Sequence, residues 1–296
     1  MKTNIIYNKD CIEGMKELPD ESVDMILCDL PYGTTQNEWD KVLPLDELWK
    51  QYKRILKNNG AIVLTSQQPF TSKLIMSNIQ MFKYNWHWNK VKPSSFFNAK
   101  NAPMKKTEDI CVFSFGNIAN GSKNLMKYNP QGLMECGKIR PPKNDSVPSQ
   151  STIGKRPSRA NSYKQEFTNY PCDLIEFSFE QNPIHPTQKP VALFEYLIKT
   201  YTNEGEIVLD NCMGSGTTAI ACINTNRQFI GYEIDTQYYK LSLERLSDKT
   251  STLPTAIPTG EFNKDLTATQ QVASPKSASQ TSLNPDIIRN LIRGLR

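Results

Sequence analysis

The feature that most constrains the fold is a repeated alternation of short apolar runs with segments of helical spacing. Mostly apolar runs occupy residues 23–28, 61–64, 206–210 and 228–233. Runs of this kind are typical of strands that are buried on both faces. Between them, segments such as Leu45 to Leu56 repeat apolar residues at the helical period. The alternation predicts an α/β fold, in which a doubly wound, mostly parallel sheet is covered by helices on both faces.

The remaining elements follow from the same patterns. We expect further strands at 5–7, 84–88 and 109–115, and helices at 11–18, 70–79, 191–201, 217–225 and 235–246. The helix that begins at Leu45 is expected to stop at residues 57–60, a basic turn with Gly60 just past the last helical turn. Together these elements predict one folded domain over residues 1–247.

Two regions depart from the alternation. Residues 117–183 read as an irregular insertion, and between residues 123 and 166 nine Lys and Arg residues outnumber three acidic ones, with aromatic residues interleaved. This insertion is either a solvated, partly disordered loop or an element that contacts nucleic acid, and we favour the second. Residues 248–296 are rich in Ser, Thr, Pro, Ala and Gln. We expect this low-complexity tail to be disordered, with a short terminal helix as the one exception.

Composition narrows the class of protein further. Seven scattered cysteines without a Cys-x-x-Cys pair argue against a disulfide framework and against a structural metal site. No apolar stretch reaches the roughly 18 residues that a membrane span needs, and the amino terminus lacks a signal-peptide core. We therefore expect a cytoplasmic protein without a metal. The net charge of +5 does not by itself separate a DNA-binding protein from an ordinary enzyme.

The first candidate site is the tetrapeptide Asp29-Leu30-Pro31-Tyr32. It follows the apolar run 23–28 and so falls at the carboxyl end of a predicted strand, where open α/β sheets bind ligands. The carboxylate of Asp29 and the backbone carbonyl of Leu30 can accept the two hydrogens of an amino group, while Tyr32 offers a flat surface to a ring. The tetrapeptide therefore predicts a site for a planar ring that carries an exocyclic amine.

The second candidate site is the glycine loop from Asp210 to Thr218, between a predicted strand and a predicted helix. Gly214 and Gly216 let the backbone approach a ligand, and the helix start favours an anion. Glu233 ends the next strand, where a carboxylate can accept from both hydroxyls of a ribose. The loop also satisfies the loose dinucleotide fingerprint, so a nicotinamide oxidoreductase remains an alternative, as does a merely structural turn.

Taken together, the motifs resemble those of amino-methylating DNA methyltransferases of the beta arrangement, in which the catalytic motif precedes the cofactor motif. The resemblance covers residues 4–116 and 183–247 and rests on four segments in one order: Asn8-Lys9-Asp10-Cys11, Asp29-Leu30-Pro31-Tyr32, Ile184-His185-Pro186-Thr187-Gln188-Lys189-Pro190, and Asp210 to Thr218. Two departures from the family pattern are Leu30 in place of the first proline and Asn211-Cys212 in place of the more usual Pro-Phe. The insertion falls where the family has its target-recognition segment.

The resemblance implies S-adenosylmethionine as cofactor and assigns roles to particular residues. Glu233 is expected to hold the ribose, Thr187 or Lys189 to lie near the methionine carboxylate, and Asp10 and Cys11 to contact the adenine end. The methionine portion is expected to be wrapped by Gly214, Ser215, Gly216, Thr217 and Thr218, after Asp210 at the strand end. For Asp10, capping of the helix that starts at Cys11 remains an alternative.

The implied reaction is methyl transfer to the 6-amino group of adenine in double-stranded DNA, after the base has been flipped out of the duplex. Asp29 and the Leu30 carbonyl would hold the amine, and Tyr32 would stack on the base. Amino-cytosine methylation is the nearest alternative, because the family's cytosine enzymes more often carry Ser at the position of Asp29. Thiolate attack by Cys172 on a cytosine ring carbon, and a catalytically silent DNA-binding protein, are further alternatives. A partner restriction endonuclease and a homodimer are expected to accompany the DNA substrate.

Overall fold

A computed structural model describes residues 1–33, 40–142, 162–180 and 188–251. Thr187, most of the motif 184–190, and the low-complexity tail from residue 252 onward lie outside the described residues. The central part of the basic insertion, residues 143–161, also lies outside them.

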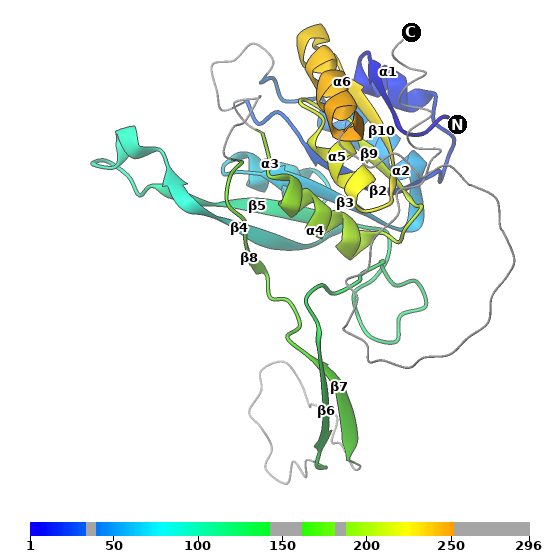
Figure 1. Ribbon diagram of the computed structural model, residues 1–296, viewed down its shortest axis with the longest axis vertical. Coiled ribbons are helices and arrows are strands. Elements are labelled where there is room, and N and C mark those ends of the chain that lie inside the picture. Colours follow the sequence, from blue (N-terminus) through cyan, green and yellow to red (C-terminus); the bar gives the residue numbers. More distant parts are fainter. Residues whose placement is uncertain (34–39, 143–161, 181–187, 252–296) are drawn as a thin grey trace, which may run out of the picture.

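The described chain is built around an eight-stranded sheet with the strand order β1-β10-β9-β2-β3-β5-β4-β8 (Figure 1). Neighbours from β1 to β3 pair in parallel, β5 is antiparallel to both of its neighbours, and β8 is parallel to β4. The strands are β1 Ile5–Asn8, β2 Val23–Asp29, β3 Leu56–Ser66, β4 Phe82–Ser94, β5 Lys105–Phe113, β8 Leu174–Glu176, β9 Ile207–Asp210 and β10 Gln228–Glu233. The predicted mostly parallel α/β sheet is confirmed.

Helices cover both faces of the sheet, as expected. They are α1 Cys11–Lys16, α2 Leu45–Ile55, α3 Phe70–Ser77, α4 Val191–Tyr201, α5 Thr217–Asn224 and α6 Thr236–Ser251, with a short 3₁₀ turn η1 at Phe96–Asn98. One core layer contains α1, α2 and α3, and the other contains α4, α5 and α6. Strand β2 divides its side chains between them, with Met25 and Leu27 in one layer and Ile26 and Cys28 in the other. Because successive side chains of a strand point to opposite faces, and both faces are buried here, the strand appears in the sequence as one apolar run.

The expected turn at residues 57–60 is wrong, because α2 passes directly into β3. The register with β2 jumps from the pair Val23–Leu56 to the pair Met25–Ala61, so the four residues between them form an irregularity inside the strand. A Cβ on Gly60 would lie 2.6 Å from the backbone oxygen of Asp24. Gly60 is therefore required by the close approach of two strands, which local sequence cannot distinguish from a helix stop.

The insertion is less irregular than its sequence suggests. Strands β6 Met134–Arg140 and β7 Tyr163–Thr168 pair in an antiparallel two-stranded sheet that projects from the body of the molecule (Figure 1). Nearly every residue of both strands is exposed or only partly buried. Because neither face is buried, the sequence carries no alternation of apolar and polar residues from which these strands could be read.

Strands β4 and β5 also extend beyond the sheet and carry η1 at their tip (Figure 1). Within the described residues, no helix is both long enough and apolar enough to cross a bilayer. Strand β2 lies between β9 and β3, so the carboxyl ends of β2, β9 and β10 lie at one edge of the sheet. The two motifs found in the sequence follow β2 and β9, and the topology therefore brings them to the same edge.

Candidate active site

The two motifs share one cavity of about 590 Å³. All four residues of the tetrapeptide line it, and so do most of the residues assigned to the cofactor: Asp10, Cys11, Lys189, Asp210, Gly214, Ser215, Thr217 and Glu233. Gly216 and Thr218 lie behind this lining. The residues predicted to accept an amine and those predicted to bind a nucleotide-like cofactor therefore lie in one place.

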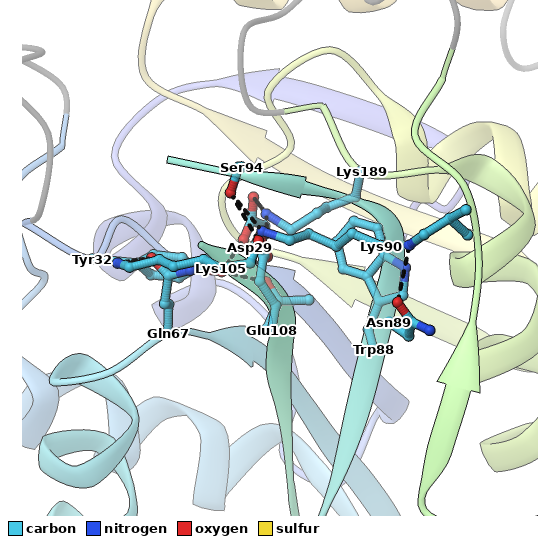
Figure 2. A network of polar contacts seen from close by, with 12 residues as sticks. Asp29, Tyr32, Gln67, Trp88, Asn89, Lys90, Ser94, Lys105, Glu108 and Lys189 are labelled. Atoms are coloured by element: carbon cyan, nitrogen blue, oxygen red, sulfur yellow. Dashed lines mark hydrogen bonds and ion pairs between the residues drawn. The ribbon is translucent and has the colours of Figure 1, made fainter. Parts of the chain in front are cut away.

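The carboxylate of Asp29 is held by three donors (Figure 2). Tyr32 donates its hydroxyl to Oδ1 over 2.7 Å, and Thr65 of β3 donates to the same oxygen. Lys189 places its ammonium 2.7 Å from Oδ2. Burial raises the pKa of Tyr32 well above its usual value, so its hydroxyl remains a donor. The carboxylate is thus fixed in orientation before any substrate arrives.

This arrangement leaves an acceptor position open on Oδ2 of Asp29. An ionised carboxylate has about four lone-pair positions, two on each oxygen. Thr65 donates to Oδ1, the single hydroxyl hydrogen of Tyr32 is shared between Oδ1 and the Thr65 hydroxyl oxygen 3.0 Å away, and Lys189 occupies one position of Oδ2. The remaining position on Oδ2 suffices for one hydrogen of an amino group, which matches the expectation that the other hydrogen goes to the Leu30 carbonyl.

Lys189 belongs to a buried network of four charges (Figure 2). Its ammonium lies 3.6 Å from Oε2 of Glu108, and Glu108 Oε1 lies 3.3 Å from the ammonium of Lys90. Burial lowers the pKa of Lys189, but the carboxylates of Asp29 and Glu108 outweigh it and raise that pKa above its ordinary value. Two cations therefore balance two anions beside the cavity. Lys189, expected near the methionine carboxylate of the cofactor, lines the shared cavity and forms an ion pair with Asp29.

Tyr32 is positioned by packing as well as by its hydroxyl. The ring of Phe70, at the start of α3, stacks on it with centroids 5.4 Å apart and an interplanar angle of 25°. The ammonium of Lys189 lies 5.6 Å from the centroid of the same ring. Because Phe70 covers one face of Tyr32, the expected stacking on a flat ligand would have to use the face opposite Phe70.

On the cofactor side, Glu233 has a fixed and largely buried carboxylate. Gly214 donates its backbone N–H to Oε2 over 2.7 Å, and Asp235 donates its own to Oε1 over 2.8 Å. Burial raises the pKa of Glu233. Asn8 ties the end of β1 to the backbone oxygen of Glu233 over 2.8 Å. The carboxylate keeps lone pairs for ligand hydroxyls, as a ribose-binding acid at this strand end requires.

Asp210 stabilises the glycine loop through hydrogen bonds to its buried carboxylate. Its carboxylate accepts from the backbone N–H of Cys212 over 3.0 Å and from the hydroxyl of Thr218. Thr218 is fully buried, so its hydroxyl shapes the loop and does not face the cavity. Gly216 has a φ of +82°, and a Cβ there would lie 3.2 Å from Cβ of Ser242. The left-handed conformation and the close contact with α6 both favour glycine.

Two further residues have structural roles beside the cavity. Asp10 accepts from the backbone N–H of Glu13 over 3.0 Å and so caps α1, while it also lines the cavity. Asn211, which departs from the family pattern, is buried and accepts from the hydroxyl of Tyr52 on α2. Tyr52 therefore provides a hydrogen-bond partner for the buried side chain of Asn211. A loop with Pro-Phe at these positions would need no such partner.

Sequence reasoning missed several residues that complete the site. Thr65 and Phe70 orient the tetrapeptide, and Glu108 and Lys90 balance Lys189. Arg245 of α6 donates to the backbone oxygen of Ser215 over 3.1 Å and to the hydroxyl of Thr217 over 3.2 Å. Each lies in a segment without a motif, so no local pattern pointed to it.

This protein has a doubly wound sheet, with an amine-acceptor motif and a nucleotide-type loop at the same edge. The combination is typical of methyltransferases that act on an amino group. The model of the N6 and N4 DNA methylase family matches residues 23–244, and the chain belongs to that family. The catalytic motif on β2 precedes the cofactor motif after β9, so the predicted beta arrangement is confirmed.

Individual relatives agree with this assignment. The DNA adenine methyltransferase YhdJ of Escherichia coli K12 is 29% identical over 254 residues, which cover 81% of this chain and 82% of that protein. The type II methyltransferase M.HpaI of Haemophilus parainfluenzae is 27% identical over 253 residues, or 81% of this chain and 73% of that protein. The crystal structure of an M1.HpyAVI–SAM complex is 26% identical, covers 81% of this chain and 98% of that one, and has a TM-score of 0.53.

The residues of the cavity fit S-adenosylmethionine. The Glu233 carboxylate is oriented for a ribose, and Gly214, with a φ of +52°, has no atom closer than 3.9 Å to the position of a Cβ, so a ligand can approach its backbone. The cofactor supplies an electrophilic methyl group when it is bound. The tetrapeptide, which is expected to hold the amine that receives this group, lines the same cavity.

Proposed function

We propose that this protein methylates the exocyclic 6-amino group of adenine in double-stranded DNA, with S-adenosylmethionine as the methyl donor. The observation that carries the proposal is the open acceptor position on Oδ2 of Asp29, in a cavity shared with Glu233 and the glycine loop. An Asp at the first position of the tetrapeptide and the name of the adenine methyltransferase from Escherichia coli both favour adenine over cytosine.

The protein's own residues act on the amine by positioning it. The lone pair of an adenine amino nitrogen is delocalised into the ring. When Asp29 accepts one of its hydrogens and the Leu30 carbonyl accepts the other, the nitrogen moves toward tetrahedral geometry and its lone pair becomes available. Tyr32 holds the ring by its free face, opposite Phe70. Oriented acceptors and close positioning supply most of the rate enhancement.

Methylation of the 4-amino group of cytosine is the second candidate. The same acceptors can hold that amine, and a cytosine-N4-specific methyltransferase, PvuII, shares the fold with a TM-score of 0.59 at 15% identity. That likeness concerns the fold alone. Thiolate attack on cytosine is disfavoured, because Cys172 lines a different cavity, formed with Tyr84, Trp86 and Tyr128.

The decisive experiment combines modified-base sequencing with one substitution. DNA from cells that express the protein is expected to carry 6-methyladenine at one recognition sequence, and this sequence is the substrate for every later assay. Asp29→Ala is expected to reduce methyl transfer at least about a hundredfold, because an oriented acceptor is lost, while cofactor affinity stays within about threefold. If 4-methylcytosine appears instead, the base is wrong. If Asp29→Ala keeps near-normal turnover, the acceptor is wrong.

Other parts of the functional picture remain predictions. The exposed basic residues Lys138, Arg140 and Lys164 on β6 and β7 fit the expected target-recognition role of the insertion. The type II names of several relatives favour a restriction endonuclease partner. A homodimer and a cytoplasmic location also remain predictions, which gel filtration and cell fractionation would test.

A further inference from the structure

We propose that the arm formed by residues 91–107, between the sheet parts of β4 and β5, inserts its tip phenylalanine Phe97 into the DNA duplex, where it occupies the space that the flipped base leaves. This inference rests on the proposed DNA methyltransferase function. It adds a role for Phe97 as a wedge, meaning a side chain that inserts between the bases of the duplex. The arm is the extension of β4 and β5 that projects from the body in Figure 1.

The arm is an ordered projection. Strands β4 and β5 remain paired at Asn89–Thr107 and again at Ser94–Lys105, with a register shift between these pairs. The tip is closed by η1, in which Asn98 and Ala99 donate backbone hydrogen bonds back to Ser95 and Phe96 over 3.1 and 3.0 Å. The tip residues are therefore presented by a hydrogen-bonded turn on paired strands.

The exposed surface of the arm is unusually apolar at its tip. Phe97 is 100% exposed and Phe96 is 76% exposed, while Val91 on β4 and Met104, just before β5, are 38% and 42% exposed. Single exposed apolar residues are common on protein surfaces, whereas adjacent phenylalanines on a projecting turn mark an interaction site. The partner must therefore offer an apolar surface to these rings.

The charge of the arm identifies the partner as nucleic acid. Residues 91–107 contain four lysines, at positions 92, 100, 105 and 106, and no Asp or Glu. A second copy of the same arm would bring like charges together, so self-association through the arms is disfavoured. DNA satisfies both requirements, because its phosphates attract lysines and its stacked bases accept an aromatic ring between them.

The root of the arm lies at the catalytic cavity. Lys90, Ser94 and Glu108, at the base of the two strands, line the cavity together with Asp29 and Tyr32. Ser94 bonds back to the backbone oxygen of Lys105 over 3.2 Å, and Lys105 reaches Gln67 of the cavity lining over 2.9 Å. Phe97 is three residues beyond Ser94, so its Cα lies within about 11 Å of that of Ser94. A duplex that delivers a base to Asp29 therefore passes within reach of the tip.

An inserted ring would lower the cost of base flipping. A flipped base loses its stacking on both neighbours and leaves a gap in the duplex. An aromatic side chain that fills this gap restores part of the stacking, as side-chain wedges do in other DNA-binding proteins. The effect must depend on the target being paired, because a base without a partner is flipped at lower cost.

The test uses Phe97→Ala with duplexes that carry the recognition sequence determined by sequencing. On a fully paired duplex, kcat/KM is expected to fall about tenfold or more. On the same duplex with an abasic site opposite the target adenine, the loss is expected to shrink to less than about threefold. A duplex with 2-aminopurine in place of the target adenine is expected to show the fluorescence rise of flipping with the wild type, and a smaller rise with Phe97→Ala.

Controls separate this proposal from others. Met76, an exposed apolar residue on α3 that is 70% exposed, provides the matched variant Met76→Ala, which should leave all three measurements unchanged. The thermal unfolding midpoint and the cofactor affinity of Phe97→Ala should match the wild type. An equal loss on paired and abasic duplexes would overturn the wedge, as would a change in oligomeric state without a change in flipping. If the wild type methylates no DNA, the proposed function has failed, which is a different result.

Discussion

At the scale of single residues, the carboxylate of Asp29 depends on charges that come from elsewhere in the chain. Asp29 faces Lys189, Lys189 faces Glu108, and Glu108 faces Lys90. The two lysines and Glu108 are largely buried, whereas the side chain of Asp29 is 23% exposed. A buried ion pair adds little net stability as a whole, but removing one partner leaves an uncompensated charge. Lys189 therefore keeps Asp29 oriented and keeps the local charge balanced.

Lys189→Met is expected to destabilise the protein by about 2 kcal/mol, somewhat less than a fully buried pair because Asp29 is partly exposed. Adding Glu108→Gln leaves one cation, Lys90, and one anion, Asp29, in the network, so the local net charge returns to zero and about half of the lost stability is expected to return. Urea unfolding without cofactor measures both variants. As a control, Lys16→Met removes an exposed ion pair with Glu13 and should change stability much less. A double variant no more stable than Lys189→Met would show that Glu108 and Lys189 are not coupled.

At the scale of elements, the cofactor loop after β9 is held by helices from both faces of the sheet. Tyr52 on α2 donates to Asn211 at one end of the loop. Arg245 on α6 donates to Ser215 and Thr217 at the other end. These hydrogen bonds satisfy the backbone oxygen of Ser215 and the side chains of Asn211 and Thr217, so the loop is organised by α2 and α6 before a ligand binds.

Arg245→Ala is expected to weaken S-adenosylmethionine binding about tenfold, because two or three hydrogen bonds that order the loop are lost. Isothermal titration calorimetry measures the affinity, and DNA binding without cofactor should be unchanged. The neighbouring Glu244→Ala is the matched control, since Glu244 is exposed on the same helix. Equal affinities for the Arg245→Ala variant and the wild type would mean that the loop needs no support from α6.

At the scale of the whole molecule, the acids of the cofactor site tie global stability to pH. Burial raises the pKa of Asp210 to about 6, from an ordinary value of 3.8. The folded protein therefore keeps a proton on Asp210 between about pH 4 and pH 6 that the unfolded chain releases. The contribution of Asp210 to stability is fully present below its ordinary pKa of 3.8, and it is lost as pH rises through the folded-state pKa of about 6.

Asp210→Asn removes this titration. As pH increases from 4 to 6.5, the wild type loses the contribution of Asp210 to its unfolding free energy, and the variant has no such contribution to lose. The unfolding free energy of the wild type, minus that of the variant, is therefore expected to decrease over this range. Urea unfolding of both proteins at several pH values measures the difference between the slopes, so the titration of other carboxylates cancels. Circular dichroism at each pH confirms that both are folded. Parallel curves for the two proteins would contradict a raised pKa of Asp210 in the folded state.

The sequence by itself determined the parallel strands, their helices and the place of both motifs, because these depend on local patterns. An apolar run such as 23–28 indicates a strand, and the glycine loop after Asp210 indicates a turn before a helix, whatever the rest of the chain packs against them. The antiparallel strands β6 and β7 were not readable, since both of their faces are exposed. Gly60 was misread, because the strand that approaches it belongs to another part of the chain.

Only the tertiary structure decided which side chains meet at the site. Lys189 is 160 residues away from Asp29 in the chain, yet their charged atoms are 2.7 Å apart. Glu108 and Arg245 likewise reach the site from β5 and α6, neither of which carries a motif. A contact between distant residues leaves no local pattern, because it arises from the packing of strands and helices that are formed independently. The sequence therefore determines the chemistry available at the sheet edge, and packing determines how its charges are paired.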